Sequence, residues 1–167
     1  MTEWIAVGYA LLAMLQDLSG RRISNWFLLA GWLSGGVLAL GQSLPGGLLQ
    51  YLGGALLPLV LLFILFYFRM MGAGDIKLLS VLGGFLGIQA SLSLLIGSFL
   101  AGAVISVVLL SVTGSWFRRF RFFYRYVCNY RATGLRIPYR PEGGSIAEVH
   151  FAVPVFVAVV LLKGGVF

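Results

Sequence analysis

Long apolar runs fill most of this chain and constrain its fold more than any other feature of the sequence. Of the 167 residues, 60% are hydrophobic and only 10% are charged, and the mean hydropathy is +0.99. Soluble domains carry about 25% charged residues. In lipid, a helix satisfies its own backbone hydrogen bonds. The composition therefore predicts an all-α integral membrane protein.

Six apolar segments are candidates for transmembrane helices. A hydrocarbon core about 30 Å thick requires about 20 apolar residues in a helix, and shorter spans are tolerated. The segments cover residues 4–18, 26–40, 48–68, 76–90, 92–113 and 151–162. They predict a polytopic bundle of about six transmembrane helices, in a single membrane-embedded domain over residues 1–167. The first segment lacks the basic start of a signal peptide, so we expect it to be retained.

The positive charges orient this predicted bundle. Ten of the 12 Lys and Arg residues lie in the three loops that follow the first, third and fifth segments, and Lys77 lies next to the second of these loops, at the start of the fourth segment. Loops on the cytoplasmic side of a membrane carry an excess of Lys and Arg. We therefore expect these three loops to face the cytoplasm and both termini to lie on the other side.

The loop after the fifth segment, about residues 114–150, contains seven arginines. Within it, Phe120, Phe123, Tyr124 and Val127 recur at helical spacing. This pattern is typical of a basic amphipathic helix on a membrane surface, with anionic lipid headgroups as its partner. Interleaved aromatic and basic residues also occur on nucleic-acid-binding surfaces. Direct attachment to a membrane span favours lipid, and no nucleic-acid partner is expected.

The only two aspartates occupy corresponding places at the ends of apolar segments on the predicted cytoplasmic side. Asp17 closes the first segment, and Asp75 immediately precedes the fourth. Carboxylates beside membrane helices are rare and generally functional. Two carboxylates that meet at one membrane face indicate an acid/base pair, in which an ionised group activates water and a protonated group hydrogen-bonds the scissile carbonyl. With one histidine and one cysteine in the chain, neither a metal nor a cofactor is expected.

Small residues precede the second aspartate. Gly72 and Gly74 bracket Ala73, where they allow a tight turn and the close approach of a peptide. Asp75 then falls in the first turn of a helix, where the helix dipole favours a carboxylate. Lys77 is expected to point away from Asp75 and to anchor the helix at the lipid headgroups.

These residues resemble a known family. The run Gly-Ala-Gly-Asp-Ile-Lys-Leu-Leu at residues 72–79 is similar to the GxGD signature of prepilin peptidases, the membrane aspartic endopeptidases of type IV pilus and type II secretion systems. Residues 17–25 resemble their second signature, an aspartate followed by basic residues and Ile-Pro-Asn, with Ser24 in the place of the proline. The resemblance covers about residues 1–113.

The resemblance implies a protease that cuts prepilin or pseudopilin precursors just before their hydrophobic stem. The site would face the cytoplasm at the bacterial inner membrane. Asp17 and Asp75 would be catalytic, and Gly72 and Gly74 would shape the site. Four further residues match supporting positions without assigned chemistry: Arg21, Arg22, Asn25 and Lys77.

Larger members of that family carry an N-terminal methyltransferase domain with paired cysteines, and nothing in this chain corresponds to it. Compact members without that domain serve Flp-type (tight adherence) pili or archaeal flagellin-like substrates, and this chain is similar to the bacterial compact type. Methylation of the product would then be absent or carried out by another protein. Two alternatives stay open. The aspartates would serve an ion-coupled transporter, whose site would lie near the membrane midplane, or the chain would be a non-catalytic scaffold of a secretion system.

Overall fold

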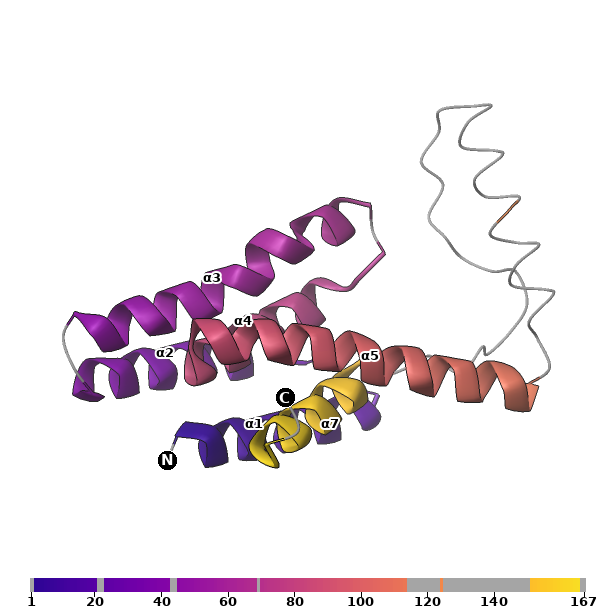
Figure 1. Ribbon diagram of the computed structural model, residues 1–167, viewed down its shortest axis with the longest axis horizontal. Helices are drawn as coiled ribbons and strands as arrows, with labels where there is room; N and C mark the ends of the chain where they lie inside the picture. Colours follow the sequence, from indigo (N-terminus) through magenta and orange to yellow (C-terminus); the bar gives the residue numbers. More distant parts are fainter. Residues whose placement is uncertain are drawn as a thin grey trace. The chain divides into compact units, whose positions relative to one another are not determined.

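The computed structural model describes residues 2–20, 23–42, 45–68, 70–113, 124 and 151–165. Over these ranges the chain forms helices and no strand (Figure 1). The helices are α1 (Thr2–Leu18), α2 (Asn25–Gln42), α3 (Gly46–Tyr67), α4 (Ala73–Leu86), α5 (Ile88–Thr113) and α7 (Ala152–Lys163). Each corresponds to one of the predicted segments, so the predicted all-α membrane bundle is confirmed. Arg21, Arg22 and all of the basic loop except Tyr124 lie outside the described residues.

The described helices differ in length. Gly46–Tyr67 in α3 and Ile88–Leu109 in α5 are long and apolar enough to cross a membrane. Asn25–Gly41 in α2 and the whole of α7 are apolar but shorter. Helix α4 has 14 residues, which corresponds to about 21 Å at 1.5 Å per residue. This short helix therefore needs its neighbours to shield it from lipid.

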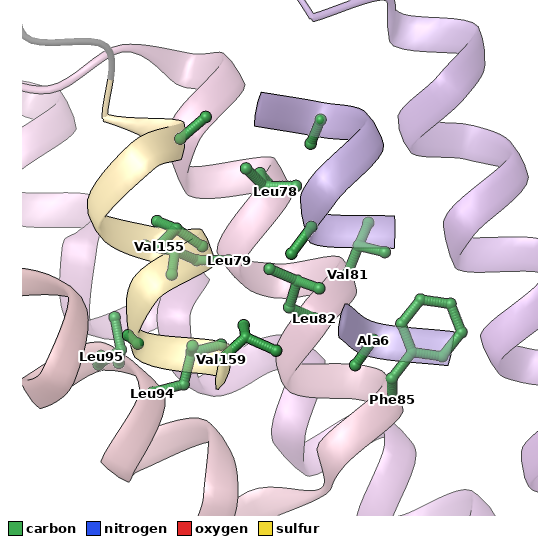
Figure 2. Close-up of a cluster of buried hydrophobic side chains, with 14 of the residues drawn as sticks. Ala6, Leu78, Leu79, Val81, Leu82, Phe85, Leu94, Leu95, Val155 and Val159 are labelled. Carbon is green, nitrogen blue, oxygen red and sulfur yellow. The ribbon is translucent and has the colours of Figure 1, made fainter. Parts of the chain in front are cut away.

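Helix α4 provides most of the buried core. It packs against α1, α2 and α3, and every residue from Leu78 to Phe85 is buried. Figure 2 shows the side chains of α4 in one apolar cluster with residues of α1, α5 and α7. Because this run leaves no face of the helix open, the packing fixes the position of Asp75 at its start.

Glycines allow α3 and α4 to bring their backbones into contact. A Cβ atom on Gly54 of α3 or on Gly83 of α4 would collide with the carbonyl group of the other residue. Two hydroxyl groups reinforce the contact, because Ser80 donates to the carbonyl oxygen of Ala55 at 2.6 Å and Ser91 donates to that of Gly54 at 2.9 Å. Small residues and interhelical hydroxyl bonds are common means of helix association in membranes.

Gly87 separates α4 from α5. Its φ of 84° lies in the left-handed region, which glycine adopts without steric cost. The sequence predicted that the fourth segment runs to residue 90, and this boundary is wrong because Gly87 ends the helix earlier.

By packing, the chain divides into two compact units, residues 1–102 with 150–167 and residues 103–149. Both aspartates, helices α1 to α4 and α7, and the first part of α5 lie in the first unit. The candidate site is therefore contained in one unit.

Candidate active site

Asp17 lies in the last turn of α1. Ala6, Ala10 and Ala13 are buried along one face of this helix, and Asp17, four residues after Ala13, continues the same face. The helix ends directly afterwards, where Gly20 adopts a φ of 69° and donates its N–H to the carbonyl oxygen of Asp17 at 3.2 Å. The Asp17 side chain is consequently half-buried and directed toward the bundle at the end of α1.

Asp75 lies in the first turn of α4, as predicted. Gly72 is the N-cap residue, and its carbonyl oxygen accepts a hydrogen bond from the N–H of Ile76 at 3.4 Å. Ile76 is buried and Asp75 is half-buried. The helix dipole at the first turn of a helix favours a carboxylate. It therefore stabilises the ionised form of Asp75, whereas partial burial disfavours that form.

The structure brings the two aspartates into electrostatic contact. Helix α1 packs against α4. Burial raises the pKa of Asp75, which immediately precedes the predicted apolar span, and the negative charge of Asp17 raises this pKa further. A nearby negative charge disfavours ionisation of a second carboxyl group. The arrangement therefore favours the protonated form of Asp75.

The two glycines before Asp75 have different surroundings. A Cβ atom on Gly72 would lie 3.1 Å from Oδ2 of Asp75, which is closer than such atoms normally approach. The missing side chain thus leaves room for the carboxylate. At Gly74 a Cβ atom would meet nothing within 4 Å, so the surface around this residue is open to an approaching molecule.

A hydrogen bond joins the two motifs directly. Lys77 Nζ on α4 donates to Asn25 Oδ1 at the first residue of α2, over 3.1 Å. Packing of α2 against α4 places this amide oxygen within reach of Lys77, which is exposed. The anchoring of Lys77 at lipid headgroups stays a prediction. Spacing along the sequence gave no signal for this contact, since 52 residues separate the partners.

An apolar cavity of about 520 Å³ lies beside Gly72. Its lining comes from the end of α3 and from the link to α4, namely Phe63, Phe66, Tyr67, Met70, Met71 and Gly72. Sequence reasoning missed this cavity, because the aromatic residues belong to a continuous apolar run and were assigned to a membrane span. Their concentration at the end of the run next to the GxGD motif was the available signal.

The described residues form no cluster of metal ligands. Across the described ranges, no group of three or more His, Cys, Asp or Glu side chains gathers as a metal site requires. The expectation that the chain uses neither metal nor cofactor stays a prediction. The carboxyl pair is the acid/base group that the described residues offer.

Comparison with known families now decides the identity. A model of the type IV leader peptidase family matches residues 4–107, which is more than half of the chain. This chain belongs to the type IV leader peptidase family. No curated protein and no solved structure gives a match.

Family membership and the apolar helices identify a membrane protein of a peptidase family. The matched residues run from α1 into α5 and include both Asp17 and Asp75. Helix α7 lies beyond the match but belongs to the same compact unit and packs against α1. The family resemblance that rested on two short motifs is thereby confirmed.

Proposed function

We propose that this chain is an aspartic endopeptidase that removes the leader peptide from prepilin-like precursors. The observation that carries the proposal is the interaction of Asp17 with Asp75, because the charge of one carboxylate raises the pKa of the other. These are the only aspartates of the sequence. They come from two separate motifs, and α1 and α4 bring them together at the ends of two helices.

The pair supplies the groups that peptide hydrolysis requires. Asp17, ionised, accepts a proton from water as the water oxygen bonds to the scissile carbonyl carbon. Asp75, protonated, donates a hydrogen bond and then a proton to the carbonyl oxygen. When the tetrahedral intermediate collapses, the C–N bond breaks and the proton held by Asp17 passes to the leaving amine. Asp75 takes back a proton from a hydroxyl group of the intermediate as the carbonyl group re-forms. Burial and the charge of Asp17 both favour the protonated form of Asp75, which supports this assignment.

The position of the pair favours proteolysis over transport. Asp17 lies at the end of α1, and Asp75 lies ahead of the buried run of α4. Both positions are helix ends, whereas transporter sites lie near the membrane midplane. The positive charges of the adjacent loops support a cytoplasmic position for this end of the helices. We therefore place the enzyme in the bacterial inner membrane as a multi-pass protein whose site faces the cytoplasm.

The substrate class follows from the family and the site together. Prepilin or pseudopilin precursors carry a hydrophobic stem directly after the cleaved bond, and the compact form resembles members that serve Flp-type pili. Anionic lipid headgroups are the partner we propose for the arginine-rich loop, because that loop is basic and aromatic.

Purified protein in lipid vesicles, incubated with a Flp-type prepilin, tests this function. Mass spectrometry should detect a mature chain that begins at the hydrophobic stem, together with the released leader. An Asp75→Asn preparation should release neither fragment. Release of the same fragments by the Asp75→Asn protein would contradict an aspartic mechanism.

A further inference from the structure

The cavity beside Gly72 has the properties of a side-chain-binding site. Its volume of about 520 Å³ falls within the range of roughly 300–1,000 Å³ that is usual for binding pockets. The side chains that line it are aromatic rings and methionine thioethers, and none of them carries a charge. Methionine adapts its shape readily, and aromatic rings offer large apolar contact areas. Such a lining accepts apolar side chains of several shapes.

The cavity adjoins the motif that carries Asp75. Gly72 lines the cavity, and a Cβ atom on Gly72 would lie 3.1 Å from Oδ2 of Asp75. Successive Cα atoms of a peptide are 3.8 Å apart. A side chain held beside Gly72 would therefore lie a short length of peptide from the Asp75 carboxylate.

The apolar lining of the cavity favours binding of the residues that follow the scissile bond over those that precede it. In the proposed substrate, the leader before the bond is polar and the stem after it is hydrophobic. An apolar cavity gains binding energy from the stem and gains none from a charged leader, which would lose its hydration there. The first residues of the stem therefore fit the cavity.

We propose that this cavity binds the first large apolar side chains after the scissile bond and so positions that bond at Asp75. The proposal rests on the proposed function, because it takes the substrate to be a precursor with a hydrophobic stem. It adds a specificity site formed by the end of α3 and the link to α4. An acyl chain of a lipid is the competing occupant, and the experiment separates the two.

Disulfide cross-linking tests the position of the stem. The single native cysteine is removed by Cys128→Ser, and Asp75→Asn keeps the precursor uncut. Met70→Cys then places a thiol in the cavity, and Val60→Cys on α3 is the matched control outside it. The two sites are similarly exposed, at 74% for Met70 and 70% for Val60. A precursor with cysteine at the first position of the stem should cross-link to Met70→Cys and not to Val60→Cys.

Filling the cavity tests its role in specificity. Met70→Trp should lower the processing rate of a precursor with phenylalanine at the first stem position by about tenfold, the order expected for losing the burial of part of one large side chain. The same variant should slow a precursor with alanine at that position much less, because alanine gains little binding energy from the cavity. Val60→Trp should affect neither precursor. Because the readout is the ratio of two substrates on one protein, a change in stability does not alter it.

The possible results separate the two proposals. Cross-linking at Met70 together with the selective loss supports the cavity assignment. Equal cross-linking at both sites, no cross-link at Met70, or an equal loss for both precursors would overturn it while leaving the protease intact. A further result would support the cavity assignment and overturn the peptidase function. In it, the precursor cross-links selectively at Met70→Cys, but the protein with Asp75 intact does not cut the precursor that it binds.

Discussion

Lys77 of α4 donates a hydrogen bond to Asn25 of α2 over 3.1 Å and thereby connects the two sequence motifs that carry the aspartates. Asp75 lies two residues before Lys77, and Asn25 begins the helix that follows the Asp17 turn. The bond therefore links the start of α4 to the segment that leaves α1. We expect this bond to fix the positions of the Asp17 and Asp75 carboxyl groups relative to each other.

Loss of this bond should slow the reaction without abolishing it. A single hydrogen bond contributes about 0.5–1.5 kcal/mol, so Lys77→Met or Asn25→Leu should lower kcat by up to about tenfold and leave KM nearly unchanged. Lys77→Arg retains a donor and should keep most of the activity.

A double-mutant cycle measures the coupling between Lys77 and Asn25 directly. Partners in one bond are non-additive, so the double variant should be no slower than the slower single variant. Fully additive losses would show that the two residues act independently and would contradict the positioning role.

The two motif glycines should respond differently to alanine. Gly72→Ala brings a methyl group against the Asp75 carboxylate, so we expect at least a tenfold loss of kcat and a displaced pH–activity profile. Gly74→Ala has open space around the new methyl group and should leave the profile in place. Identical profiles for the two variants would show that the contact between Gly72 and Asp75 has no influence on the pair.

Stability should depend on the ionisation of Asp75. Burial and the charge of Asp17 raise its pKa in the folded state, so the folded protein binds the proton more tightly than the unfolded chain. The contribution to stability is complete below the unfolded pKa and is lost as the pH rises through the folded pKa. Asp75→Asn cannot ionise, so its Tm should equal or exceed the wild-type Tm at neutral pH.

This difference in Tm should shrink in acid, where the wild-type carboxyl group is protonated as well. Thermal unfolding of both proteins in the same detergent, at neutral and at acidic pH, provides the measurement. A lower Tm for Asp75→Asn at neutral pH would mean that the ionised form stabilises the fold, contrary to this account.

The close contact between α3 and α4 should leave no room for a side chain at Gly54 or Gly83. Gly54→Ala or Gly83→Ala forces the two backbones apart, and overpacking of a core costs about 1–3 kcal/mol. Gly8→Ala on α1 is the control, because its Cβ would meet nothing within 4 Å and alanine favours a helix. Thermal unfolding should show a clear loss for the first two variants and none for the third.

The sequence predicted local features of this protein well. Hydropathy located all the described helices, and the motif around Asp75 placed that residue correctly in a first helical turn. These features depend on residues that are neighbours along the chain or on one helix face.

The sequence pattern did not predict features that depend on tertiary packing. The break at Gly87 falls inside a stretch that is apolar on both sides, so hydropathy does not mark it. The partner of Lys77 is set by how α2 packs against α4. The cavity beside Gly72 forms between the end of α3 and the link to α4, and a linear run of aromatic residues does not specify how these segments pack.

The most direct test of the central claim is the processing of a co-expressed Flp-type prepilin in cells that carry the wild-type, Asp17→Asn or Asp75→Asn protein. Glu3→Gln serves as the matched control, since Glu3 is an exposed carboxylate at the other end of α1. Asparagine preserves the size of each side chain but cannot exchange the shared proton. We predict that wild-type and Glu3→Gln cells convert the precursor, and that each aspartate variant reduces conversion at least 100-fold at equal membrane levels. Conversion at the wild-type rate by either aspartate variant would contradict the account.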